Sequence, residues 1–326
     1  MKTCFKNELK KTADSIKECR SDNDLCFALL TDSCMSEEVS DTIENIKAED
    51  SEIGFDFIVH LGNIINGDNP ELISRRIYES EIERFKNSIA AKKLFVTQGY
   101  TDGWRNETYI GQLAKNIMTD EVWYYETSFI NSYENVSRPA NKPYYFADIP
   151  DKNVRLIFLC SYNYQINTAL GLFDKYTGIS VEQASWLMTD ALVGCEGKEV
   201  IIISHRIPKS RFELGTDPFI YAGFSTEQIL AIIQQAQKRG VRLVCHFGGG
   251  YGCDCEAKIA GINHAIINSQ LASNTFNAKC DGVRTGSDRT LNTVNQDCWD
   301  AAVLKPKERE LRLFRFGCGT DRIIKY

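Results

Sequence analysis

The stretch most indicative of the fold is residues 25–34, Leu25-Cys26-Phe27-Ala28-Leu29-Leu30-Thr31-Asp32-Ser33-Cys34. An apolar, strand-like run ends here in small polar side chains, and the pattern returns further along the chain. Alternation of such strands with helical patterns favours a layered α/β fold. Ligands bind beyond the carboxyl ends of the strands in such sheets, so the polar stretches are expected at one edge. They are Thr31-Asp32-Ser33-Cys34, Gly62-Asn63, Gly99-Tyr100-Thr101-Asp102, Ser204-His205 and Cys245-His246-Phe247-Gly248-Gly249-Gly250-Tyr251.

The order and setting of these stretches resemble the motifs of the calcineurin-like metallophosphoesterases, which read D-x-H, G-D, G-N-H-[DE], H and G-H-x-H. The resemblance spans nearly the whole chain. It implies a four-layer β-sandwich of the α/β class, flanked by helices, with a site for two divalent metal ions. The C-terminal run from Arg315 to Arg322 is similar to the ends of such proteins from gut Firmicutes and their bacteriophages.

The resemblance also implies the domain organisation. We expect an N-terminal helix within residues 1–22 and a single metallophosphoesterase-like domain over residues 23–326. Within that domain, residues 120–150 are rich in aromatic residues and proline, and we expect an insertion there, either an irregular excursion near the rim of the site or a packed surface insertion. A closing hairpin is expected over residues 298–326, with Arg315, Asp321 and Arg322 forming an ion pair that holds the tail.

Most residues that hold metal in the family are replaced in this chain. Asp32 and His205 keep the family's residue type, and Cys34 stands where the family has a His. The bridging Asp is replaced by Asn63, whose neutral amide cannot hold two cations together at short range.

The third and fifth motifs lose further groups. Tyr100 stands in place of the family's Asn and Thr101 in place of its catalytic His, whereas Asp102 matches the last residue of that motif. The final G-H-x-H has no match, because glycines and Tyr251 occupy the stretch.

These replacements predict a catalytically degenerate protein, a non-catalytic binding or assembly module rather than an enzyme, with no cofactor. An association with bacteriophage is implied only by the resemblance of the C-terminal run. The alternative is a metal-dependent phosphoesterase whose altered site holds one Zn, Mn or Fe ion through Asp32, Cys34 and His205, since three ligands and a water suffice for zinc. A third hypothesis is a phosphate or nucleotide held without cleavage, with charge from Arg105, Arg206, Lys209 and Arg211.

A separate group of soft ligands lies close together in sequence. Cys245-His246 and Cys253-Asp254-Cys255 fall within eleven positions, which is consistent with a new zinc site. Their spacing differs from the common C-x-x-C knuckles, and neighbours in a strand point to opposite faces. Free thiols are therefore the favoured interpretation.

Composition limits the functional classes. A net charge of −6 and a pI near 5.4 argue against nucleic-acid binding. The longest early apolar run, Leu25–Leu30, is too short for a membrane span or an export signal, so we expect no membrane association. Twelve cysteines without such a signal indicate reduced thiols and a cytoplasmic protein, or a virion component made in the cytoplasm. The expected partner is another protein or a second copy of the chain.

Overall fold

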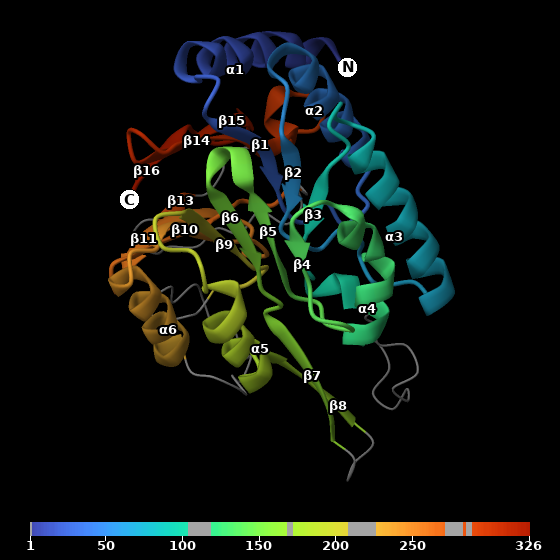
Figure 1. The fold of residues 1–326 in the computed structure, drawn as a ribbon. Helices are drawn as coiled ribbons and strands as arrows, with labels where there is room; N and C mark the ends of the chain where they lie inside the picture. The colour runs from blue at the N-terminus through green and yellow to red at the C-terminus, as the bar shows by residue number, and fades with distance from the viewer. Residues whose placement is uncertain (1, 104–118, 168–171, 208–225, 271–282, 285–288) are drawn as a thin grey trace.

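Two β-sheets lie face to face between layers of helices (Figure 1). The structure is a computed structural model, and it describes residues 2–103, 119–167, 172–207, 226–270, 283–284 and 289–326. Helices α1 (Lys6–Cys19), α2 (Val39–Ile53) and α3 (Glu71–Lys86) accompany the first sheet. Helices α5 (Val181–Trp186) and α6 (Thr226–Lys238) cover the second. This is the predicted α/β sandwich flanked by helices.

The first sheet has six strands in the order β16-β15-β14-β1-β2-β3. Strands β1, β2 and β3 run parallel, and β14, β15 and β16 extend the sheet in antiparallel fashion from β1. All six residues of β1 are buried, as its uninterrupted apolar run predicts for a strand covered on both faces. The bounds are β1 Leu25–Leu30, β2 Phe57–His60, β3 Leu94–Val96, β14 Cys298–Lys305, β15 Glu310–Gly317 and β16 Arg322–Lys325.

The second sheet has eight strands in the order β13-β11-β12-β10-β9-β6-β5-β4. Its centre, from β6 through β9 and β10 to β12, is parallel, and both flanks are antiparallel. A separate ribbon pairs β7 (Tyr162–Asn167) with β8 (Leu172–Thr177). The bounds are β4 Val136–Ser137, β5 Tyr145–Ile149, β6 Val154–Phe158, β9 Glu199–Ile203, β10 Arg242–Gly248, β11 Asp254–Ile259, β12 Ile262–Ile266 and β13 Val283–Arg284.

The segment 120–150 is more regular than its composition predicts. It contains α4 (Asp120–Glu126) and the strands β4 and β5, which complete one flank of the second sheet. Of the two alternatives for this segment, these regular elements agree with a packed insertion and disagree with an irregular excursion. Three of the aromatic side chains are core residues, namely Trp123, Tyr144 and Tyr145, and the Tyr145 ring stacks on Phe158 at 4.4 Å between centroids, whereas Tyr125 is exposed.

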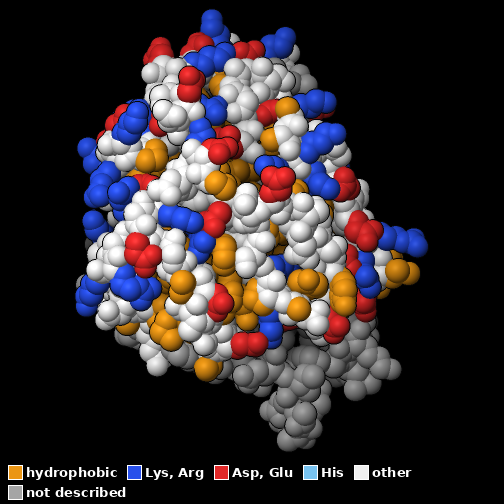
Figure 2. Space-filling model, in the orientation of Figure 1, with side chains coloured by type: hydrophobic (Ala, Val, Ile, Leu, Met, Phe, Trp, Pro, Cys, Tyr) orange, Lys and Arg blue, Asp and Glu red, His pale blue; other side chains and the backbone are white. Residues whose placement is uncertain are grey.

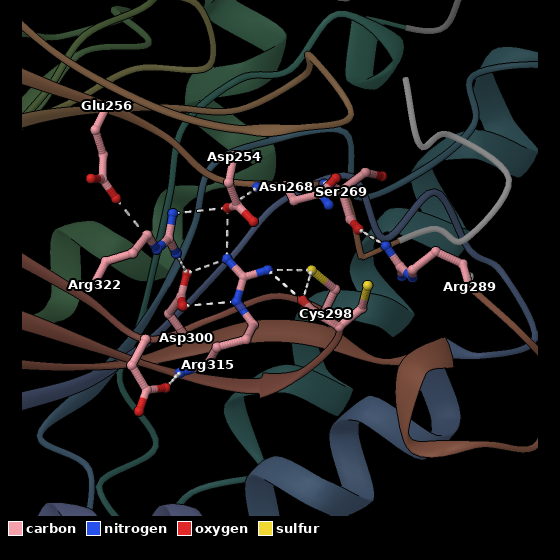
Figure 3. A network of polar contacts seen from close by, with 11 residues as sticks. Asp254, Glu256, Asn268, Ser269, Arg289, Cys298, Asp300, Arg315 and Arg322 are labelled. Atoms are coloured by element: carbon pink, nitrogen blue, oxygen red, sulfur yellow. Dashed lines mark hydrogen bonds and ion pairs between the residues drawn. The ribbon is translucent and has the colours of Figure 1, made fainter. Parts of the chain in front are cut away.

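A buried ionic network joins the C-terminal strands to the second sheet (Figure 3). Arg315 on β15 donates to Asp300 at 3.0 Å and to Asp254 on β11 at 2.7 Å. Arg322 on β16 bonds the same two carboxylates. Two cations and two anions, each at most 4% exposed, thus neutralise one another between the sheets. The prediction of an ion pair that includes Asp321 is wrong for the described contacts: the two guanidinium groups pair with Asp254 and Asp300, and Asp321 accepts from the Arg315 backbone N–H.

Removal of one acidic side chain from this network should destabilise the fold, because it leaves buried positive charge without its partner. We expect Asp300→Ala to lower the free energy of unfolding by about 3–5 kcal/mol, because the two guanidinium groups would then share Asp254 in a dry environment, with only Glu256 as a further acid, 3.7 Å from Arg322 Nε. Asp321→Ala is the matched control, since Asp321 is exposed and its one described bond should cost no more than about 1.5 kcal/mol. Urea unfolding of both variants measures the difference, and equal losses would contradict the network's role.

Candidate functional site

Strand register brings the predicted motif residues to one edge. Leu30 pairs with His60, and His60 pairs with Val96, so β1, β2 and β3 end level with one another. In the second sheet Phe247 of β10 pairs with Ile203 of β9. The polar stretches leave these five strands at the same end of the sandwich. We call Asp32, Cys34, Asn63, Thr101, Asp102, His205 and Gly250 the motif site.

Close packing explains the glycine of the third motif. A Cβ atom built on Gly99 would overlap the backbone nitrogen of Asn63, so only glycine lets the loops after β2 and β3 meet there. Asp102 completes this junction. Its carboxylate accepts from the backbone N–H groups of Asn63, Ile64, Ile65 and Gly99 at 2.7–3.2 Å. The Asp102 side chain therefore holds two loops together and is fully engaged by the backbone.

Asp32 lies at the centre of the motif site and is completely buried. Its Oδ1 accepts from the Asn63 side-chain amide at 2.6 Å, and its Oδ2 accepts from the Gly250 backbone N–H at 3.0 Å. Burial raises the pKa of Asp32 to about 6, although these two bonds and the charge of Arg206 act in the opposite direction. Both oxygens of the carboxylate thus receive an N–H donor.

The orientation of the Asn63 amide follows from its two neighbours. The Thr101 backbone N–H can only donate, and it lies 2.8 Å from Asn63 Oδ1. The opposite atom, Nδ2, faces the Asp32 carboxylate, which accepts when ionised. A flipped amide would set donor against donor at Thr101 and oxygen against oxygen at Asp32. Asn63 therefore presents an N–H to Asp32 where the family presents a second carboxylate.

His205 is held by the chain beneath it. Its Nδ1 donates to the Leu61 carbonyl at 2.6 Å, which fixes the ring, and in a neutral imidazole Nε2 would then be the unprotonated nitrogen. Nε2 lies 4.0 Å from Asp32 Oδ1. Two ligands of a tetrahedral zinc ion, each at about 2.0–2.1 Å, lie roughly 3.4 Å apart, so Asp32 and His205 are near this separation.

The glycines of the fifth motif fill the space between the sheets. Cβ atoms built on Gly249 and Gly250 would overlap Thr31 Oγ1 and the His205 ring respectively. If the family's G-H-x-H is aligned on residues 248–251, Gly249 stands at the position of its first histidine, and the Thr31 side chain occupies the space that a Cβ there would need. No larger side chain fits at either position without displacing its neighbour.

The other predicted residues take peripheral places. Cys34 is a thiol whose pKa is raised by burial and further by Asp32 and Asp102, so it stays protonated. The Thr101 hydroxyl donates to the Ile65 carbonyl. The Tyr100 ring lies 5.7 Å from the Tyr162 ring. The structure brings Asp32, Asn63 and His205 together. Among the described residues, Cys34 does not form a metal-ligand group with Asp32 and His205.

Sequence reasoning missed Tyr162, which borders the motif site. Its ring centre lies 5.7 Å from that of His205, and its hydroxyl lies 3.4 Å from Arg206 Nε. The Arg206 guanidinium stacks on Tyr251 at 4.1 Å from the ring centre. Arg206 was among the predicted cations, and Arg105, Lys209 and Arg211 lie outside the described residues. Tyr162 follows β6 without a motif of its own, so only the fold identifies it.

The donor set of the motif site does not fit a two-metal centre. The Asn63 N–H and the Gly250 N–H point at the two oxygens that a metal pair would need. Within the described ranges, no group of three or more His, Cys, Asp or Glu side chains is arranged to hold a metal ion. The eleven cysteines in those ranges are free, and no helix there is long and apolar enough to cross a membrane.

Comparison with solved structures identifies the fold as metallophosphoesterase-like. The chain is similar to a dimetal phosphatase from Danio rerio, with a TM-score of 0.60, 14% identity and coverage of 93% of this chain and 99% of that one. It is also similar to GAP50, described as the anchor in the inner membrane complex of Plasmodium, with a TM-score of 0.51, 12% identity and coverage of 89% and 84%. At these identities the likeness shows the fold alone. No family model and no curated protein matches the sequence.

Substitution of two glycines by alanine tests how closely the backbone at Gly250 packs against the His205 ring. Gly250 and Gly261 both have positive φ, at +73° and +81°, but a Cβ meets the His205 ring only at Gly250. We expect Gly250→Ala to lower the free energy of unfolding by about 1–3 kcal/mol more than Gly261→Ala, because the added methyl group overpacks the motif site. Chemical denaturation measures the free energy of unfolding of both variants. Similar losses of stability would contradict the prediction, because they would mean that a methyl group at position 250 is accommodated beside His205.

The raised pKa of Asp32 predicts a pH dependence of stability. Between about pH 4 and pH 6 the folded protein keeps a proton on Asp32 that the unfolded chain has released. The contribution of Asp32 to the free energy of unfolding therefore falls as pH rises through this window, by on the order of 3 kcal/mol. Stability measured against pH for Asp32→Asn should lack this fall, and exposed Asp22→Asn should follow the wild type. A parallel curve for Asp32→Asn would contradict the prediction.

Proposed function

We propose that the chain is a catalytically degenerate metallophosphoesterase-fold protein that acts as a non-catalytic binding or assembly module. The observation that carries this proposal is the hydrogen bonding of Asp32. Its two oxygens accept from Asn63 and Gly250, so hydrogen-bond donors stand where the resembled family needs cations. These two charge-assisted bonds offset part of the cost of burying the Asp32 carboxylate without any metal, although burial still leaves its pKa raised.

Loss of the other reacting groups supports the same function. Thr101 stands in place of the catalytic His and uses its hydroxyl on the Ile65 carbonyl, so it offers no acid near neutral pH. The loop junction beneath the site is nevertheless intact, since Asp102 keeps all its backbone partners. A retained scaffold with replaced chemistry is what a binding role requires.

A phosphoesterase with a single metal ion is the second candidate. It is favoured by the 4.0 Å separation of His205 Nε2 and Asp32 Oδ1, and by the Leu61 carbonyl that orients the ring as in many metal sites. Such a centre would have to displace the Asn63 amide from Asp32. Cys34 would also have to lose its proton, which burial disfavours.

A protein partner or a second copy of the chain is the binding target that we propose. Acidic and basic side chains are interspersed over the face in Figure 2, and hydrophobic side chains appear between them in its lower half. Mixed surfaces of this kind suit protein contacts better than a nucleic-acid backbone, which needs a continuous basic surface. A phage-associated role, in the cytoplasm or in a virion, rests on the resemblance of the C-terminal run alone.

Metal loading tests the proposed function directly. Purified protein is loaded with Mn, Fe or Zn, exchanged into metal-free buffer and analysed by elemental mass spectrometry, beside a phosphomonoester and phosphodiester assay. We expect no activity and no metal that depends on Asp32 and His205, because their neighbours present N–H donors. Asn63→Asp is the positive control: it sets two carboxylates together, so divalent metal should raise its melting temperature.

The decisive result is the dependence of metal on the motif site. Near-stoichiometric metal that disappears in both Asp32→Ala and His205→Ala, together with phosphoesterase activity, would replace the proposal with the single-metal enzyme. Metal that survives both substitutions is held elsewhere and leaves the proposal standing.

A further inference from the structure

Two histidines outside the motif site lie side by side on the second sheet. His246 on β10 pairs in register with His264 on β12, and their ring centres are 5.4 Å apart. Both are buried, with His264 only 1% exposed. Strand neighbours Cys245 and Ala265 belong to the core between the sheets, so the two imidazoles point to the other face, toward the helix layer. As predicted, Cys245 and His246 lie on opposite faces.

Hydrogen bonding fixes the proton on His246. The Ser204 hydroxyl donates to the Arg206 carbonyl at 2.6 Å, so its oxygen is left to accept. His246 Nε2 lies 2.8 Å from that oxygen and must therefore be the protonated nitrogen. Nδ1 then carries the lone pair. An imidazole whose N–H is held by an oxygen acceptor, with its other nitrogen unprotonated, is the usual arrangement of a metal ligand.

The remaining ring nitrogens of this pair have no hydrogen-bond partner. In the part of the chain that the structure describes, this holds for His246 Nδ1 and for both Nδ1 and Nε2 of His264. Buried polar atoms are nearly always satisfied, and each exception costs about 1–3 kcal/mol. His60 shows the contrast, because Ser33 and the Gly62 N–H engage its two nitrogens. Two neighbouring imidazoles with three unsatisfied nitrogens point to a missing ligand between them.

The spacing of the rings fits a shared metal ion. Zinc binds an imidazole nitrogen at about 2.0–2.1 Å, which places the ring centre roughly 3.2 Å from the ion. Two such rings at a tetrahedral angle have centres about 5.2 Å apart. The observed 5.4 Å agrees with this geometry. Burial lowers the pKa of His264 to about 4 and, together with His264, lowers that of His246, so both rings are neutral and able to ligate at pH 7.

We propose that His246 and His264 form a metal site for a borderline divalent cation such as Zn²⁺, distinct from the motif site. His246 ligates through Nδ1, His264 through one ring nitrogen, and water or another small ligand completes the coordination. Imidazole pairs suit zinc, copper and nickel better than magnesium or calcium, which prefer oxygen. No third His, Cys, Asp or Glu side chain of the described residues completes the group, so the site is open rather than a closed structural one.

Zinc titration of the metal-free full chain tests this site. We expect one equivalent to bind by calorimetry, with affinity reduced at least tenfold in His246→Gln and in His264→Gln. Ser204→Ala keeps both rings and should weaken binding about 10–100-fold by removing the orienting contact. His60→Gln is the matched control, because it removes a buried histidine whose nitrogens are already engaged and should leave zinc affinity unchanged.

X-ray absorption of the zinc-loaded wild type provides a readout that needs no variant to fold. Two imidazoles with oxygen ligands and no sulfur are expected. One imidazole with a sulfur would instead indicate Asp32, Cys34 and His205, and would overturn the inference, as would binding that disappears in His205→Gln but survives in His264→Gln. Absence of zinc binding would also overturn it. That last result leaves the proposed function untouched, whereas metal at Asp32 and His205 would defeat both.

Discussion

The carboxylate of Asp32 is the contact on which the motif site depends. It receives the Asn63 amide from the loop after β2 and the Gly250 N–H from the loop after β10, so one side chain joins both sheets where their strands end. Because the carboxylate is completely buried, it needs donors or cations to offset its lost hydration. In this chain the donors are N–H groups of the protein itself.

The same requirement governs the buried ionic network. Arg315 and Arg322 bring two charges between the sheets, and Asp254 and Asp300 neutralise them. Asp254 opens β11 four residues after Gly250, so the network also anchors the end of the fifth motif loop. The buried carboxylates in both places accept hydrogen bonds from partners distant in sequence. His246 and His264 differ in that three of their ring nitrogens, close together on neighbouring strands, have no hydrogen-bond partner among the described residues.

Sequence patterns predicted the sheet core well, because an uninterrupted run of apolar residues predicts a strand that is buried on both faces. The run Leu25–Leu30 forms a strand buried along its whole length, and the residues after it reach the site edge as expected. Residues 120–150 were predicted less well for the converse reason. Tyrosine and proline there indicate a loop locally, yet Tyr145 and Trp123 become buried only once the second sheet and α3 are packed around them. No local pattern contains those neighbours.

By itself the sequence determined the layered fold, the order of the polar stretches and the presence of Asn63 where the resembled family has an acid, since each is a matter of residue type and position along the chain. Tertiary structure alone decided which groups contact the Asp32 carboxylate. The orientation of the Asn63 amide depends on Thr101, and the second donor to Asp32 comes from residue 250, more than two hundred positions away. The pairing of His246 with His264 likewise follows from strand register. Hydrogen bonds between distant segments need precise geometry, and folding supplies it only after the core has formed.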